Sequence, residues 1–191
     1  MREFIGYHGT TKENGMAILK TRQFISSGTY DDWLGKGVYF FEDDKHQAYM
    51  YVKYKEGKEH ILPHNEICVL HSKIIVSDLN VLNLITDEDK RFLYEYCSLI
   101  EERINKKREE IGDWQHKEGF VIDSLMEDTD GGLDLIRAAY QVPKQRLKYK
   151  NFDFLNTHIQ LCVKNARCIV AEEIKEVDCD AYRRNEEKSV G

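Results

Sequence analysis

The chain has 191 residues and a net charge of −6, and it corresponds to about one domain. Hydrophobic residues make up 41% and charged residues 32%, which excludes a disordered chain and a collagen-like repeat. No apolar run approaches the ~18 residues that a membrane span needs, and the start shows no signal peptide. We expect a single domain over residues 1–180, a charged tail over 181–191, and a cytoplasmic protein with no membrane partner.

Cysteine usage and charge limit the function classes further. The five cysteines are an odd number and form no Cys-x-x-Cys pair, which predicts reduced thiols and neither a disulfide nor a zinc framework. His60 and His64 flank Pro63, so we interpret them as solvated loop residues and expect no metal site. The acidic balance argues against a protein that coats nucleic acid by bulk charge, but it is compatible with one local basic patch.

The first half of the chain alternates short strands and short helices. Aromatic and β-branched runs bounded by glycine or polar residues indicate the strands. Spaced apolar residues indicate the helices, and Thr10 or Thr11 is suited to cap the first of them. The expected elements are a strand around 4–7, a helix over 12–21, a strand over 38–41, a helix over 45–53, and strands over 66–76 and 81–84.

The second half begins with the clearest helical pattern, in which apolar residues recur in steps of three, four and seven. The expected elements are a helix over 87–110, a strand over 120–123, a turn over 130–132, a helix over 133–140, and strands over 158–163 and around 168–172. Short strands mixed with helices favour an α+β domain over alternating β-α-β units.

Three segments carry the most information about chemistry. They are Tyr-His-Gly-Thr at residues 7–10, Trp-Leu-Gly-Lys-Gly-Val-Tyr-Phe at 33–40, and Asn-Thr-His-Ile-Gln-Leu-Cys-Val at 156–163. Together, and in this order, they resemble the motifs of the ADP-ribosyltransferase superfamily in its diphtheria-toxin-like and poly(ADP-ribose)-polymerase-like branch. The resemblance is strong in the first two segments and weaker in the third. It implies an α+β core of two small curved β-sheets packed face to face, with flanking helices and NAD bound between the sheets.

The resemblance also implies a role for each matching residue. His8 would hydrogen-bond a ribose of NAD, and Thr10 could add a hydroxyl there. Gly9 would let its backbone approach the nicotinamide carboxamide closely. Tyr39 would stack on the cationic nicotinamide ring. A second aromatic wall would come from the next helix, where Tyr49 and Tyr51 are both candidates.

The third segment departs from the family pattern. Family members place a glutamate where this chain has Gln160, and that carboxylate stabilises the positive charge that develops as nicotinamide leaves. An amide can orient the ribose hydroxyls but supplies no general base. The departure favours transfer of a single ADP-ribose over chain elongation, and Asp123 and Asp128 are alternative acids.

Basic residues at 144, 146, 148 and 150 would share one face if that segment were extended, with Lys164 and Arg167 following later. One interpretation is an anion-binding rim for NAD phosphates or a nucleic-acid backbone, and the other is an edge strand protected by lysines.

The sequence therefore predicts an NAD-dependent mono-ADP-ribosyltransferase of the bacterial toxin or phage-defence type, with an antitoxin partner. Its acceptor would be a nucleic acid, slightly favoured, or a protein. Two alternatives remain. One is a catalytically silent module that binds NAD or ADP-ribose, and the other is an RNA 2′-phosphotransferase of related fold.

Overall fold

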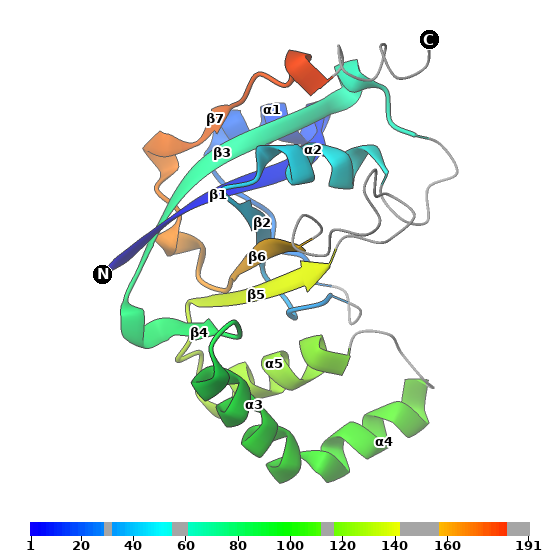
Figure 1. The fold of residues 1–191 in the computed structure, drawn as a ribbon, viewed down its shortest axis with the longest axis vertical. Helices are drawn as coiled ribbons and strands as arrows, with labels where there is room; N and C mark the ends of the chain where they lie inside the picture. The colour runs from blue at the N-terminus through cyan, green and yellow to red at the C-terminus, as the bar shows by residue number, and fades with distance from the viewer. Residues whose placement is uncertain (29–31, 55–60, 112–116, 142–156, 183–191) are drawn as a thin grey trace.

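The computed structural model describes residues 1–28, 32–54, 61–111, 117–141 and 157–182. The fold is α+β, built on a mixed seven-stranded sheet in the order β4-β5-β6-β2-β1-β3-β7 (Figure 1). Only β4 and β5 pair in parallel among these strands; the other pairs are antiparallel. The strands are β1 (Arg2–Thr11), β2 (Val38–Glu42), β3 (Ile67–Val76), β4 (Val81–Asn83), β5 (Leu135–Gln141), β6 (Thr157–Val163) and β7 (Lys175–Glu176).

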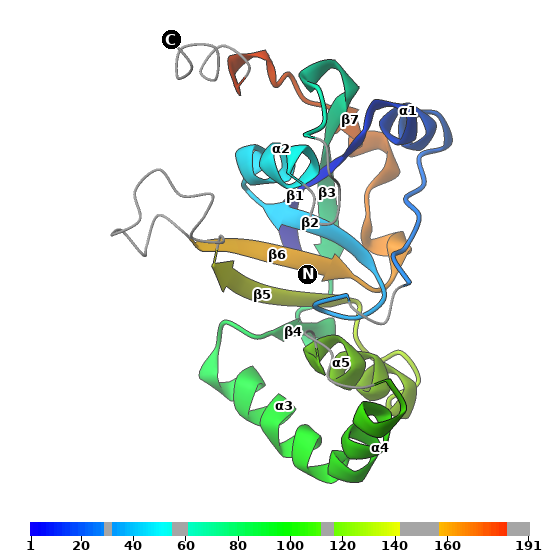
Figure 2. The same cartoon turned by 90° about the vertical axis from the view of Figure 1, so that its right-hand side faces the viewer.

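Two faces of this sheet are covered by different helices. The α-helices are α1 (Lys12–Thr21), α2 (Lys45–Lys53), α3 (Asp87–Leu99), α4 (Glu101–Ile111) and α5 (Lys117–Asp128). Ile18 of α1 joins a core with Phe4 and Phe40 on one face. On the other face α2 covers Phe41 and Val69, and α5 packs against Ile136 and Cys162. The helices α3, α4 and α5 gather at the β4–β5 end of the molecule (Figures 1 and 2).

The expectation of two sheets packed face to face is corrected by the strand pairing. The described strands form one hydrogen-bonded sheet, because β1 pairs with β2 at Gly6–Glu42 and Tyr7–Phe41. This junction is short, because the described β1–β2 ladder consists of these two pairs. By contrast, β1 and β3 pair over their whole length from Arg2–Val76 to Thr11–Ile67. The sheet is therefore continuous, with two halves that meet at a short ladder.

Several predicted elements are confirmed. The helices over 12–21 and 45–53 have the predicted limits, and three of the four strands predicted in the first half are present within one residue. The first strand is longer than the predicted 4–7: it runs from Arg2 to Thr11 and so includes the His-Gly-Thr segment. Thr11, one of the two candidates, caps α1 by accepting a hydrogen bond from the Asn14 N–H at 3.3 Å. The strand over 158–163 is also confirmed, beginning one residue earlier.

Two predicted elements in the second half have the opposite type. The segment 120–123 lies in α5 and not in a strand, because Val121, Ile122 and Leu125 bury one helical face. The segment 133–140 is mostly β5 and not a helix, since it pairs with β4 on one side and β6 on the other. In both cases a short apolar run fits either period, and tertiary contacts decide.

Three further boundaries are corrected. The helix over 87–110 is broken at Ile100, a buried residue whose ψ of 16° ends α3 so that α4 can turn. The segment around 168–172 forms no strand; it contains two short 3₁₀ turns and a single bridge from Ile169 to Ile74. Tyr182, expected in the tail, packs its ring 5.4 Å from Tyr49, and residues 183–191 lie outside the described part.

Candidate functional site

The residues singled out from the three motifs lie on three neighbouring strands. His8 is on β1, Tyr39 on β2 and Gln160 on β6, and these strands are adjacent in the order β1-β2-β6. Tyr39 lies opposite Cys162, and Phe41 lies opposite Gln160, so Tyr39 and Gln160 project from the same face. This is the face of the sheet on which both α2 and α5 pack.

His8 projects from the opposite face but is bonded to β2. Its Nδ1 lies 2.8 Å from the Tyr39 carbonyl oxygen, and a carbonyl can only accept, so Nδ1 carries the proton. The ring also packs edge-on against Phe24 and Phe40, with centroid distances of 5.2 and 5.7 Å. The imidazole is therefore held at the end of the β1–β2 ladder, and its neutral form presents Nε2 as an acceptor.

Gly9 lies just beyond the end of this ladder. Backbone groups alternate sides along a strand, and the Ile5 carbonyl accepts the Asp43 N–H on the β2 side. The Gly9 N–H and C=O therefore point toward β2 as well, yet the described pairing stops at Tyr7–Phe41. A Cβ at Gly9 would lie 2.1 Å from the Ala48 carbonyl oxygen of α2. Packing of α2 thus requires glycine here, and the described β1–β2 pairing does not reach the Gly9 backbone.

Tyr39 is anchored through its hydroxyl group. The hydroxyl donates to the Gly35 carbonyl at 2.7 Å and accepts the Leu34 N–H at 2.8 Å. Burial raises the pKa of this hydroxyl above its usual value, so it stays protonated. The ring is therefore oriented by the loop that precedes β2, and this loop carries the Gly-Lys-Gly part of the second motif.

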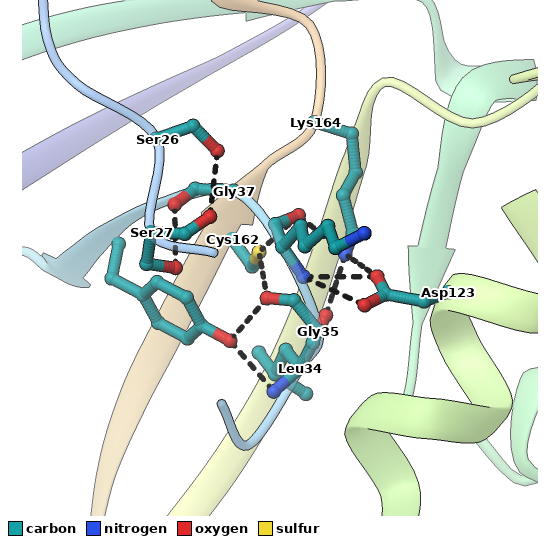
Figure 3. Close-up of polar contacts among 10 residues, drawn as sticks. Ser26, Ser27, Leu34, Gly35, Gly37, Asp123, Cys162 and Lys164 are labelled. Atoms are coloured by element: carbon teal, nitrogen blue, oxygen red, sulfur yellow. Dashed lines mark hydrogen bonds and ion pairs between the residues drawn. The ribbon is translucent and has the colours of Figure 1, made fainter. Parts of the chain in front are cut away.

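The loop itself is clamped by a lysine and an aspartate (Figure 3). Lys164 Nζ donates to the carbonyls of Leu34 and Lys36 at 2.6 and 2.7 Å and lies 3.2 Å from Asp123 Oδ1. The Asp123 carboxylate also accepts the Lys36 N–H at 2.9 Å. Gly35 has a φ of +71°, and a Cβ there would meet Asp123 at 2.1 Å, so only glycine fits. The Lys164–Asp123 clamp thus fixes the residues that hold Tyr39.

Gln160 contacts a histidine that the sequence analysis did not single out. Its Nε2 lies 3.0 Å from Nε2 of His158, two residues earlier on the same face of β6. His158 is 6% exposed, and burial lowers its pKa to about 4, opposed by the nearby charge of Asp44. The same-face spacing from Gln160 was the sequence signal that could have identified His158.

The two aromatic candidates on α2 have different environments. Tyr49 is fully buried, and its hydroxyl lies 3.0 Å from His64 Nδ1, so it is a core residue and cannot wall a ligand. Tyr51 is 42% exposed, and its ring lies 5.7 Å from that of Phe41, which faces Gln160. Tyr51 is therefore the candidate that remains. Thr10 lies on the α1 face, close to Gly15.

The alternative acids and basic residues occupy other positions. Asp123 belongs to the loop clamp, and Asp128 on α5 accepts from Tyr96 and Arg103 at 2.6 and 2.7 Å, away from Gln160. Lys164 is 4% exposed and paired, which corrects its place in an anion-binding rim. The basic stripe over 144–150 lies outside the described residues, so that prediction stays open.

Comparison with known proteins gives a similarity without an assigned activity. The chain is 26% identical over 183 residues to the uncharacterized protein MJ0359 of Methanocaldococcus jannaschii, covering 85% of this chain and 83% of that protein. No family model matches the chain, and no solved structure matches it. None of the helices described in the structure is long and apolar enough to cross a bilayer.

Proposed function

We propose that the protein is an NAD-dependent mono-ADP-ribosyltransferase. The observation that carries the proposal is the adjacency of β1, β2 and β6, which brings His8, Tyr39 and Gln160 from distant parts of the sequence to neighbouring strands. Each belongs to a motif that resembles this superfamily. The proposal includes an ADP-ribosyltransferase core within the α+β fold, with one continuous sheet in place of two.

The end of the β1–β2 ladder is where NAD would bind. The Gly9 N–H and C=O, directed toward β2 beyond the last described pair, match the carbonyl and amide of the nicotinamide carboxamide. His8, with its proton on Nδ1, would accept a ribose hydroxyl at Nε2. Tyr39 and Tyr51, on the face shared with Gln160, would contact the nicotinamide ring.

The reaction breaks the bond between C1′ of the ribose and the nicotinamide nitrogen. Nicotinamide leaves with the bonding electrons, the acceptor nucleophile forms a new bond to C1′, and the acceptor loses a proton. Gln160 would stabilise the cationic ribose through its amide oxygen, without accepting that proton. A neutral amide at this position favours a single transfer to an acceptor that needs little activation.

The acceptor class stays a prediction, with nucleic acid slightly preferred over protein. So does the role of a cytoplasmic toxin or phage-defence effector neutralised by an antitoxin. A second candidate function, an NAD-binding or ADP-ribose-binding module without turnover, is favoured by one observation: Gln160 replaces the family's glutamate and has no carboxylate.

The test uses purified protein, cell lysate and NAD labelled on the adenylate phosphate. We expect label in a macromolecule and release of nicotinamide, and nuclease or protease digestion identifies the acceptor. His8→Ala and Tyr39→Ala should each lower nicotinamide release at least 100-fold, about 3 kcal/mol of lost transition-state stabilisation, because one removes the ribose contact and the other the stacking ring.

His71→Ala is the matched control. This histidine lies on β3, which pairs with β1 and not with β2, and bonds the Glu173 carbonyl through Nδ1, so its removal leaves the His8–Tyr39 bond in place and activity should be retained. Wild-type turnover that persists in both the His8 and the Tyr39 variant would refute the proposed site. NAD binding in calorimetry without nicotinamide release would favour the binding module.

A further inference from the structure

A glutamine side chain has two ends of similar shape and opposite hydrogen-bonding character. The Nε2 of Gln160 lies 3.0 Å from Nε2 of His158. An amide nitrogen only donates, so the imidazole nitrogen must accept. His158 is therefore neutral and carries its proton on Nδ1, and the amide oxygen of Gln160 is left to accept from another group.

The surroundings of His158 hold it in this state. Its ring lies 5.1 Å from Phe41 on β2 and 6.2 Å from Tyr140 on β5, where it is stacked. Asp44, at the start of α2, is the charged group that favours protonation, and burial outweighs it. Burial thus lowers the pKa of His158 below neutral pH, which favours the neutral ring whose Nε2 accepts from Gln160.

The second ring nitrogen shows that this arrangement has a cost. His158 Nδ1 is buried, and no hydrogen-bond partner for it is found among the described residues. A buried donor without a partner costs about 1–3 kcal/mol. A histidine that served packing alone would gain by bonding Nδ1, whereas this ring is committed to Gln160 through Nε2.

We propose that His158 is a positioning residue that fixes the direction of the Gln160 carboxamide, so that its oxygen and not its amino group meets the nicotinamide ribose. The inference rests on the proposed function. The negative end of the amide dipole stabilises a cationic ribose, and the amino end would destabilise it. The orientation of the carboxamide therefore decides whether Gln160 can replace the glutamate found in the family.

The test is a double-mutant cycle on nicotinamide release, because a carboxylate has two accepting oxygens and needs no such orientation. His158→Phe keeps a ring between Phe41 and Tyr140 but removes the acceptor. In the wild-type background it should lower kcat at least tenfold and change the KM for NAD less than threefold. In a Gln160→Glu background the same change should alter kcat less than threefold.

Equal losses in the two backgrounds, or no loss in the wild type, would overturn the inference. If His158→Phe does not fold by circular dichroism, His158→Gln takes its place, since its amide oxygen can reach the position of Nε2 and should retain more than a third of kcat. A larger loss in a folded His158→Gln protein would equally overturn the assignment.

A measurement on the wild-type protein separates this inference from the proposed function. Nitrogen-15 NMR of His158 at pH 7 should show the neutral tautomer with the proton on Nδ1. A proton on Nε2, or a charged ring, would overturn the inference while leaving NAD turnover in place. Absence of both nicotinamide release and NAD binding would instead overturn the proposed function, and with it the task assigned to His158.

Discussion

Side chains in this site are held in place by hydrogen bonds to specific neighbouring groups. Tyr39 bonds two backbone groups of one loop, and His8 bonds the carbonyl of Tyr39 itself. His158 has one nitrogen bound to Gln160 and the other without a described partner. Of these residues, His158 is the one whose ionisation we follow, because burial lowers its pKa and favours the neutral ring.

The stability of the protein should fall in acid because of His158. Its pKa is lowered from 6.5 to about 4, so the unfolded chain binds the proton more tightly. Stability from this residue is complete above about pH 6.5 and is lost as the pH falls toward 4, by on the order of 2–3 kcal/mol. Urea unfolding between pH 4 and 7 measures it.

His158→Phe provides the comparison for this measurement, since it cannot titrate. The variant should show a shallower decline over the same pH range, and the difference between the two curves isolates the histidine. Parallel curves would show that His158 titrates alike in the folded and unfolded states.

At the scale of elements, the loop before β2 is held by groups from two distant elements. Lys164 follows β6, and Asp123 is on α5, and together they bond three backbone groups of residues 34–36. The clamp therefore couples the packing of α5 to the position of Tyr39. Lys164 and Asp123 can therefore affect the position of Tyr39 without contacting the reacting atoms of NAD.

Lys164→Met should destabilise the fold by about 3 kcal/mol, because it strands the Asp123 charge and two backbone carbonyls in a largely buried site. The KM for NAD should rise as Tyr39 loses its fixed loop. Chemical denaturation and NAD titration measure the two effects.

Lys12→Met is the matched control, because Lys12 pairs with Glu176 at the half-exposed surface. That pair should contribute less than about 1 kcal/mol. If both variants lost equal stability, the clamp would be no stronger than an ordinary surface ion pair.

At the scale of the molecule, the two halves of the sheet meet at the two residue pairs between β1 and β2. The half formed by β4, β5, β6 and β2 carries α3, α4 and α5, and the half formed by β1, β3 and β7 carries α1 and α2 (Figure 2). A ligand at the end of this ladder would touch both halves. Binding there would therefore require the two halves of the sheet to stay joined at the β1–β2 ladder.

The protein should unfold in one cooperative transition, because Phe40 and Leu161 join Phe4 and Leu70 in one core across the junction. Trp33, 4.5 Å from Tyr140, reports on the β5–β6 half when Trp114 is replaced by Phe. Its fluorescence and the far-ultraviolet circular dichroism should give coincident urea curves. Two separated transitions would show that the halves unfold independently at the β1–β2 ladder.

The sequence by itself determined the elements whose signals are local. Capping and apolar spacing placed α1 and α2 to the residue, and aromatic and β-branched runs placed β2 and most of β3. The motif residues His8, Tyr39 and Gln160 were also identified from sequence, as was the order of their segments. Their roles in NAD chemistry stay predictions.

Only the tertiary structure decided what depends on long-range pairing. Leu135–Gln141 became a strand because β4 and β6 flank it, and the apolar run at 120–122 became one face of α5. Likewise Tyr49 proved to be core, and His158 proved to lie within hydrogen-bond distance of Gln160. Periodicity reports which side of an element is buried, but the partner that buries it comes from a distant part of the chain.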